Sequence, residues 1–153
     1  MKPFPHSYNV SVEAKSETEA TISAKGLTSL ASAAPPEFGG PGNLWSPETL
    51  LVGAVADCFI LTFKAIAATA RFNWHEIHCD SSGVVDRAEG GVRFTRILLH
   101  VRLTVPAGTD KERAQVLLKK AEKGCLIAKS LRFSPELFYE VLTTEEVPHS
   151  LAS

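Results

Sequence analysis

The most informative part of the chain is the stretch WSPETLLVGAVADCFILTFKAIAATA, which runs from Trp45 to Ala70. Ser46 is a typical N-cap residue, Pro47 suits the first helical position, and Glu48 places an acid in the first turn. The stretch therefore predicts a helix that ends at about Arg71. Its apolar residues occupy nearly every side of that helix, and such a helix is normally buried on all sides. Because a chain of 153 residues cannot easily surround so long a helix by itself, the pattern predicts burial in a dimer.

The same stretch is the one membrane candidate in the sequence. From Leu50 to Phe72 it is long enough to cross a bilayer. It carries Asp57 near its middle and Lys64 further along, both of which are costly in lipid, and no basic cluster flanks it. We therefore expect a helix buried in protein and no membrane partner.

The overall composition fits a single domain, residues 1–153, with enough apolar residues for a core. Lys and Arg number 16 against 17 Asp and Glu, so the charge gives no reason to expect nucleic acid as a partner. The first residues lack the apolar run of a secretory signal. Three cysteines without such a signal predict a cytoplasmic protein, in which a disulfide is transient and catalytic.

The hydrophobic pattern on either side of the long helix predicts strands. Three short segments with period two precede it, and the loop PPEFGGPGN separates them from the helix. The order β-β-β-α-β-β-α-α-β is typical of an α+β fold with antiparallel pairing. The predicted strands are Tyr8–Ala14, Ala20–Ala24, Leu27–Ala33, His75–Val85, Ile97–Val105 and Glu136–Leu142, and the later helices run from Thr109 or Asp110 to Lys123 and onward from Cys125.

Cys79 lies in WHEIHCD, a segment with the composition of a metal cluster. Strand alternation places His75 and Cys79 on one face and His78 on the other. His75 and Cys79 would also lie about 13 Å apart along the strand, too far to share a zinc ion whose ligands sit about 2 Å from it. We therefore interpret Cys79 as a half-buried strand cysteine and expect no metal site.

Cys125 follows Gly124, which interrupts the preceding helix, so the thiol lies at the start of the next helical turn. Free backbone N–H groups there, together with Lys120, Lys123 and Lys129, favour a negative charge and would lower the thiol pKa. The alternative is a packing cysteine beside a solvated face of lysines. The residues alone leave both interpretations open.

Cys58 lies at the centre of the long helix. Apolar surroundings and the adjacent Asp57 should raise the pKa of its thiol, which favours a packing role. A cation that reaches the sulfur would oppose this effect, and Thr62, one turn further on, can offer a hydroxyl. The residues alone therefore leave two interpretations of Cys58 open, a cysteine that only packs in the core and a reactive thiol.

Taken together, these motifs resemble the OsmC/Ohr family of thiol-dependent peroxidases. The resemblance rests on the glycine-bearing loop that leads to Pro47-Glu48, on Ala56-Asp57-Cys58-Phe59 and on Gly124-Cys125-Leu126. The order of elements also matches over essentially the whole chain. The resemblance implies an OsmC-like α+β fold, in which antiparallel sheets wrap long central helices in an intertwined homodimer.

By match of motif, Cys58 corresponds to the peroxidatic thiol, Cys125 to the resolving thiol and Glu48 to the acid at the helix start. The implied activity is reduction of organic hydroperoxides or hydrogen peroxide in the response to oxidative stress. The Cys58 thiolate would become a sulfenic acid, which Cys125 traps as a disulfide. An external dithiol, typically lipoyl-based in the organic-hydroperoxide branch, would restore the thiols, and no bound cofactor is implied. Ten helical residues span about 15 Å, so Glu48 would act on Cys58 through an intermediary or from the partner subunit.

The family's peroxidases also place an arginine from the N-terminal sheet or the following loop beside the peroxidatic sulfur. In this sequence the first arginine is Arg71. Lys25 is the only cation between Lys15 and Lys64, so it is the candidate in that region. Arg96 and Arg102, on a later predicted strand, are further candidates.

Two other classes of function stay open. A non-catalytic protein could bind a small molecule in an apolar pocket at a dimer interface. A hydrolase with a cysteine nucleophile would act on acyl or thioester substrates, but it needs a base near the thiol and an oxyanion site. No motif links Cys58 to any of the histidines, which are His6, His75, His78, His100 and His149.

Overall fold

The computed structural model describes residues 2–146. The chain divides into two compact units, Met1–Leu50 and Leu51–Ser153. The expectation of one domain over residues 1–153 stays a prediction, and each unit is described by itself.

The first unit holds a small antiparallel sheet. Its strands are β1 (Ser11–Glu13), β2 (Ala20–Ser23) and β3 (Leu30–Ser32), which pair in that order with Val12 opposite Ile22. All three strands lie inside the segments predicted from the period-two pattern. The antiparallel meander predicted for this part of the chain is therefore confirmed.

The loop after β3 contains one turn of regular structure that was not predicted. Pro36–Phe38 form the 3₁₀ helix η1, which ends at Gly39 with a φ of 84°. This left-handed conformation is readily available only to glycine. The rest of the predicted loop is irregular, and Ser46 follows it.

The long helix α1 spans Pro47–Thr69, close to the predicted limits. The Oγ of Ser46 accepts a hydrogen bond from the backbone N–H of Thr49 at 3.2 Å, and the Oγ1 of Thr49 accepts one from the backbone N–H of Ser46 at 2.9 Å. This reciprocal pair satisfies N–H groups that a helix start otherwise leaves free. Arg71, in the left-handed conformation with a φ of 47°, follows the end of the helix.

The sheet of the second unit consists of β4 (Glu76–Ala88), β5 (Gly91–Val105) and β6 (Glu136–Thr143), in that order. β4 and β5 form a long antiparallel pair, but β5 and β6 are parallel. This last pairing differs from the antiparallel pairing predicted. The reason is the crossover through α2 (Lys111–Gly124) and α3 (Leu126–Lys129), since a helical connection is what parallel neighbours require.

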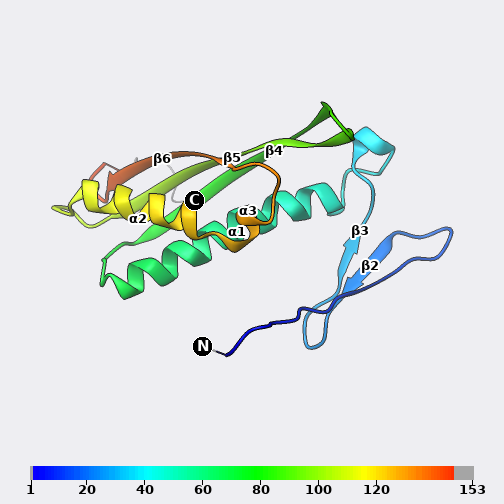
Figure 1. The fold of residues 1–153 in the computed structure, drawn as a ribbon, viewed down its shortest axis with the longest axis horizontal. Helices are drawn as coiled ribbons and strands as arrows, with labels where there is room; N and C mark the ends of the chain where they lie inside the picture. Colours follow the sequence, from blue (N-terminus) through cyan, green and yellow to red (C-terminus); the bar gives the residue numbers. More distant parts are fainter. Residues whose placement is uncertain (1, 147–153) are drawn as a thin grey trace. The chain divides into compact units, whose positions relative to one another are not determined.

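The helices of the second unit cover one face of this sheet. Figure 1 shows β4 and β5 running along α1, and α2 and α3 lie on the same side of the sheet as α1. Alternate residues of β5 are buried and their neighbours face outward, as predicted from the period-two pattern. The core is made of Val55, Phe59, Phe63 and Ala67 from α1, Ile97, Leu99, Val101, Leu103 and Val105 from β5, and Ala114, Leu117, Leu118 and Ala121 from α2.

The opposite side of α1 is not covered within the second unit. Leu61 is 54% exposed, and Asp57 and Lys64 are also exposed. By length and composition, α1 is the one helix within residues 2–146 that could cross a bilayer. Because the core helix of a soluble protein passes the same test, this is weak evidence for a membrane span. Within the second unit, α1 therefore has one side in the core and one partly apolar side that is not covered.

Candidate active site

The structure brings Cys58 and Cys125 together. Cys58 is half-buried in the middle of α1, and Cys125, which is 1% exposed, lies between α2 and α3. Both thiols are free, and a hydrogen bond joins them. The two residues with the motifs of peroxidatic and resolving thiols are therefore neighbours, although they lie far apart in the sequence.

The thiol of Cys58 has a lowered pKa. Burial has the largest single effect and raises the pKa of Cys58, but several hydrogen-bond donors together outweigh it. A donor stabilises the charged thiolate and so lowers the pKa. In decreasing order of effect, the donors are the backbone N–H of Ile127, the thiol of Cys125, the hydroxyl of Thr62 and the backbone N–H of Leu126. The arrangement favours the nucleophilic thiolate form of Cys58 over that of an isolated cysteine.

The thiol of Cys125 has the opposite tendency. Its pKa is raised, first by burial and further by the neighbouring Cys58. Its Sγ accepts a hydrogen bond from the backbone N–H of Ala128 at 3.5 Å and lies 3.9 Å from the carbonyl oxygen of Val55, which competes with Cys58 for the one proton of the Cys125 thiol. The helix start and the lysines therefore do not make Cys125 the more acidic thiol. Of the two, Cys58 ionises first and Cys125 keeps its proton.

Gly124 allows the connection between α2 and α3 to approach α1. A Cβ atom built on Gly124 would lie 3.0 Å from the Cγ2 of Thr62, which is tighter than most real contacts. The missing side chain brings the N–H groups of Leu126 and Ile127 within reach of Cys58. Sequence reasoning interpreted Gly124 only as a helix breaker and missed these two donors. Only the hydroxyl of Thr62 was anticipated.

The candidate arginines do not serve Cys58. The Nε of Arg96 lies 2.7 Å from a carboxylate oxygen of Glu136, and the Nε of Arg102 lies 2.8 Å from one of Glu140. Both ion pairs join β5 to β6 at the surface of the sheet. Among the described residues, the groups that set the pKa of Cys58 include no cation. Within one copy of the chain, neither Arg96 nor Arg102 is among the groups that set the pKa of Cys58.

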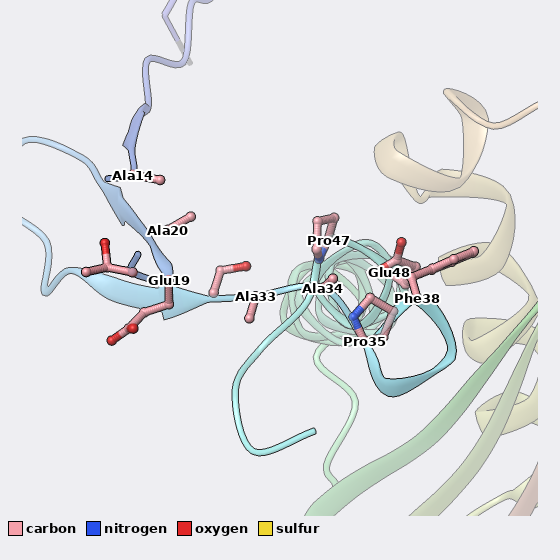
Figure 2. Close-up of a pocket in the computed structure, with 11 residues that line it drawn as sticks. Ala14, Glu19, Ala20, Ala33, Ala34, Pro35, Phe38, Pro47 and Glu48 are labelled. Carbon is pink, nitrogen blue, oxygen red and sulfur yellow. The ribbon is translucent and has the colours of Figure 1, made fainter. Parts of the chain in front are cut away.

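Glu48, the third candidate residue, lies in the first unit and lines a cavity of about 610 Å³ together with Glu19 and Phe38. Figure 2 shows that Glu48 reaches this cavity from the first turn of α1. Its Oε2 is buried and has no hydrogen-bond partner among the described residues. A buried carboxylate oxygen favours a cationic or hydrogen-bonding partner. The role of Glu48 in the thiol site stays a prediction.

Cys79 does not belong to the thiol pair. It is half-buried in β4, and burial, assisted by the charge of Asp80, raises the pKa of Cys79 to about 11. The interpretation as a half-buried strand cysteine is confirmed. Within residues 2–146, no group of three or more His, Cys, Asp or Glu side chains could hold a metal ion. None of the described histidines is among the groups that set the Cys58 pKa, and His149 lies outside the described residues.

Comparisons with known sequences point to one family. The profile of the family described as OsmC-like protein matches residues 40–140. The organic hydroperoxide resistance protein of Xanthomonas axonopodis pv. citri is 35% identical over 100 residues, which are 64% of this chain and 68% of that protein. Peroxiredoxin OsmC of Escherichia coli is 27% identical over 96 residues, 63% of this chain and 66% of that protein. YmaD of Bacillus subtilis, an uncharacterised protein, is 28% identical over 109 residues, 69% and 73% of the two chains.

Solved structures show the same fold. An OsmC-like protein of unknown function from Vibrio cholerae superposes with a TM-score of 0.79 at 19% identity. The superposition covers 90% of this chain and 100% of the other. An organic hydroperoxide resistance protein from Legionella pneumophila gives a TM-score of 0.70 at 22% identity, over 90% of this chain and 99% of the other. The predicted α+β fold is therefore confirmed.

Proposed function

The chain belongs to the family of OsmC-like proteins, and on this premise we propose that it is a cytoplasmic thiol-dependent peroxidase of the oxidative-stress response. Its substrates would be organic hydroperoxides or hydrogen peroxide. The observation that carries the proposal is the hydrogen-bonded pair of Cys58 and Cys125, in which one thiol has a lowered pKa and the other a raised pKa. Relatives named organic hydroperoxide resistance protein and peroxiredoxin support the same class.

The proposed cycle uses the difference between the two thiols. The Cys58 thiolate attacks one oxygen of the peroxide, the O–O bond breaks, and the other oxygen leaves as an alkoxide that takes up a proton. Cys58 is then a sulfenic acid. The sulfur of Cys125 attacks the Cys58 sulfur, water leaves, and a disulfide forms. An external dithiol, which kinship suggests is lipoyl-based, returns the pair to thiols by exchange.

The hydrogen bond between the thiols suits both steps. While Cys58 is ionised, the proton of Cys125 stabilises it, so the resolving thiol is not itself a competing nucleophile. After oxidation, the two sulfurs are already neighbours. A disulfide tolerates only a short separation between its two residues, so the adjacency of the thiols supports the second step without a large rearrangement.

The proposal places the site in a homodimer. One support is the open side of α1, on which Leu61 is 54% exposed. Another lies in the first unit, where Tyr8, Val10 and Val12 are 84%, 62% and 64% exposed. Extended apolar surfaces of this kind usually mark an interaction site. A second copy of the chain is the partner that the family resemblance implies.

Glu48 is proposed as the third residue of the site. Its buried, unpaired Oε2 would accept a hydrogen bond from a cation, either Lys25 or a group of the second copy. Glu48→Gln should then lower the rate of peroxide consumption without preventing formation of the Cys58–Cys125 disulfide. An unchanged rate in Glu48→Gln would remove Glu48 from the site.

The central experiment measures the consumption of an alkyl hydroperoxide in the presence of a dithiol. Cys58→Ser should abolish turnover, whereas Cys79→Ser, as the matched control, should retain it. Cys125→Ser should still consume one equivalent of peroxide in the first turnover but form no intramolecular disulfide. Full activity in Cys58→Ser contradicts the assigned nucleophile, and an unchanged disulfide yield in Cys125→Ser contradicts the resolving role.

The second candidate is a non-catalytic small-molecule binder. The cavity of about 610 Å³ in the first unit favours it, since its volume lies in the range of small-ligand pockets. Titration with peroxide followed by intact-mass measurement separates the two candidates. Loss of two hydrogen atoms supports the redox pair, and an unchanged mass supports the binder.

A further inference from the structure

The near-zero net charge of the chain conceals an uneven distribution of its charged residues. The chain has 16 Lys and Arg and 17 Asp and Glu. The segment from Lys111 to Pro135 contains seven of the basic residues and two of the acidic ones, and the rest of the chain contains nine basic and fifteen acidic residues. This segment, which includes α2 and α3, belongs to the second unit (Figure 1). A basic segment therefore stands in a chain that is otherwise acidic.

Part of this charge gathers on one surface, which we call the basic patch. Lys119 and Lys123 are one turn apart on α2, and Lys120 lies beside them, on the side of the helix that faces away from the core. Lys129, at the end of α3, lines the same cavity as Lys123 and extends the patch. All four lysines are exposed, and none forms an ion pair within residues 2–146.

Few acidic groups oppose this charge. Glu112 lies on the same side of α2, but it precedes Lys119 by seven residues, about 10 Å along the helix. Glu122 is half-buried at the edge of the patch, where it lines the cavity beside Lys123. Four exposed cations therefore meet one half-buried carboxylate, and the surface keeps a net positive charge.

Apolar side chains are exposed among the lysines. Val116, one turn before Lys120, is 50% exposed, and Leu126, between Lys123 and Lys129 in the sequence, is 64% exposed. A basic surface with exposed apolar side chains is typical of proteins that bind at the surface of an anionic membrane. The combination provides both electrostatic attraction and apolar contact.

On the basis of the proposed peroxidase activity, we propose that the basic patch docks the protein on the surface of an anionic lipid bilayer. The lipid phosphates would neutralise the lysines, and Val116 and Leu126 would contact the headgroup region. Clusters of about four to eight basic residues attach proteins to such surfaces, and each cation strengthens binding about fivefold. Peripheral binding of this kind does not require α1 to enter the bilayer.

The position of the thiol site favours a bilayer over an acidic protein as the partner. Organic hydroperoxides with an apolar body concentrate in lipid rather than in water. The basic patch adjoins the thiol site, because Leu126 supplies one of the backbone N–H groups that donate to Cys58. Docking through the patch would hold Cys58 close to the phase that contains such substrates.

Flotation with lipid vesicles tests the docking surface directly. At low ionic strength, the wild-type protein should float with vesicles of equal parts phosphatidylglycerol and phosphatidylcholine, and it should not float with phosphatidylcholine alone. Binding should be lost in 0.5 M NaCl, because exposed charges are then screened. Failure to bind the anionic vesicles, or equal binding to both kinds, overturns the inference. A protein that ignores anionic vesicles but binds polyglutamate would instead have an acidic protein as its partner.

Substitutions locate the binding surface. Each single Lys→Gln change in the patch should weaken binding to anionic vesicles about fivefold, and the quadruple variant should lose more than about a hundredfold. A charge-matched control removes four exposed cations elsewhere and should bind like the wild type. It carries Lys2→Gln, Lys15→Gln, Arg87→Gln and Arg93→Gln. Equal binding by the two quadruple variants overturns the assignment of the patch.

Rate measurements connect docking with substrate supply. The quadruple patch variant should consume an apolar hydroperoxide dissolved in anionic vesicles at least about tenfold more slowly than the wild type. Its rate with a short, water-soluble alkyl hydroperoxide should be unchanged, which also shows that the variant is folded. Unchanged rates with both substrates would mean that docking does not supply substrate, and would overturn that part of the inference.

A failure of docking can be distinguished from a failure of the proposed function. Vesicle binding is measured without peroxide, and Cys58→Ser should bind like the wild type. If the wild-type protein consumes no hydroperoxide in solution, the peroxidase proposal fails and the flotation result still decides the docking surface. If it consumes hydroperoxide but does not bind vesicles, the peroxidase proposal stands and the docking surface is wrong.

Discussion

The hydroxyl of Thr62 donates a hydrogen bond to the sulfur of Cys58 from one turn further along α1. The side chain of Thr62 also faces Gly124, where the chain enters the turn that carries the N–H groups of Leu126 and Ile127. Thr62 thus contributes a donor to the thiolate and lies against the segment that supplies the other donors. Replacing Thr62 by a residue of similar shape without a hydroxyl therefore removes one donor to the thiolate and changes the packing little.

Thr62→Val should raise the pKa of Cys58, because it removes one donor to the thiolate and keeps a branched side chain. The rate of peroxide reaction at neutral pH should fall about twofold to tenfold, the range expected for one hydrogen bond. The measurement is the pH dependence of Cys58 alkylation, whose midpoint should move to higher pH. Thr62→Ser retains the hydroxyl and serves as the control. A pH profile in Thr62→Val identical to that of the wild type would contradict the assigned hydrogen bond.

The three cysteines should differ in the pH at which they react with iodoacetamide. Thiols react as thiolates, so Cys58, with its lowered pKa, should be labelled first as the pH rises. Cys79, whose pKa is raised to about 11, should stay largely unlabelled at pH 9. Peptide mapping after short exposures at pH 6 to 9 checks the order. Labelling of Cys125 ahead of Cys58 would reverse the proposed roles of the pair.

Leu61→Arg should convert a dimer into a monomer if the open side of α1 is the contact between subunits. A charge there would be buried against an apolar surface without a partner. Light scattering coupled to size-exclusion chromatography gives the mass directly. Val116→Arg, at a residue of α2 that is 50% exposed, is the control and should leave the mass unchanged. A monomeric wild-type protein would refute the dimer itself.

Glu146→Gln should reduce the loss of stability in acid. The Nζ of Lys111 lies 2.8 Å from a carboxylate oxygen of Glu146, and these hydrogen bonds, with those from Thr143, lower the pKa of Glu146 to about 2. The folded pKa is below the ordinary value of 4.5. The contribution is therefore complete above about pH 4.5 and is lost as the pH falls through about 2.

Urea unfolding at pH 7 and pH 3 measures this contribution. The difference in the free energy of unfolding between the two pH values should be smaller in Glu146→Gln than in the wild type. Glu145→Gln, at the neighbouring position, which makes no ion pair within residues 2–146, is the control. If the free energy of unfolding changes by the same amount between pH 7 and pH 3 in all three proteins, the ion pair of Lys111 and Glu146 does not stabilise the fold.

Phe63→Ala should destabilise the second unit by about 3 to 5 kcal/mol, the usual cost of removing a large aromatic side chain from a core. Phe63 is 0% exposed and meets the ring of Trp74 edge-on, with 5.6 Å between the ring centroids. Chemical denaturation followed by Trp74 fluorescence measures the change. The control is Val116→Ala at the surface, which should shift the free energy of unfolding by no more than about 0.5 kcal/mol. A similarly small change for Phe63→Ala would mean that the core tolerates the cavity.

Most of the fold could be predicted because it follows local rules. The cap at Ser46, the two-residue period of β5 and the break near Gly124 each depend on neighbouring residues, and the structure has all three. The parallel pairing of β5 with β6 was missed. The apolar alternation of a strand shows which face is buried but not the direction of the neighbouring strand. The parallel direction of β6 follows from the crossover through α2 and α3, which the alternation does not indicate.

The thiol site was predictable only in part. The motifs identified Cys58 and Cys125, but nothing in the local pattern showed that the two sulfurs are hydrogen-bonded. The sequence offered only charged side chains as candidates to stabilise the Cys58 thiolate. Two of these candidates, Arg96 and Arg102, form ion pairs with Glu136 and Glu140 on the sheet. Backbone N–H groups occur at every position except proline and leave no compositional signal. Their action on Cys58 depends on a close approach between segments that are distant in sequence.

The donors to Cys58 have a consequence for how its reactivity responds to the medium. The field of a guanidinium extends over many ångströms and is weakened as ionic strength rises. Peptide N–H groups act at contact distance, have no titratable proton in the ordinary range, and cannot be modified by reagents that attack arginine. A thiolate held by Leu126 and Ile127 should therefore keep its nucleophilicity in concentrated salt and after treatment with dicarbonyl compounds.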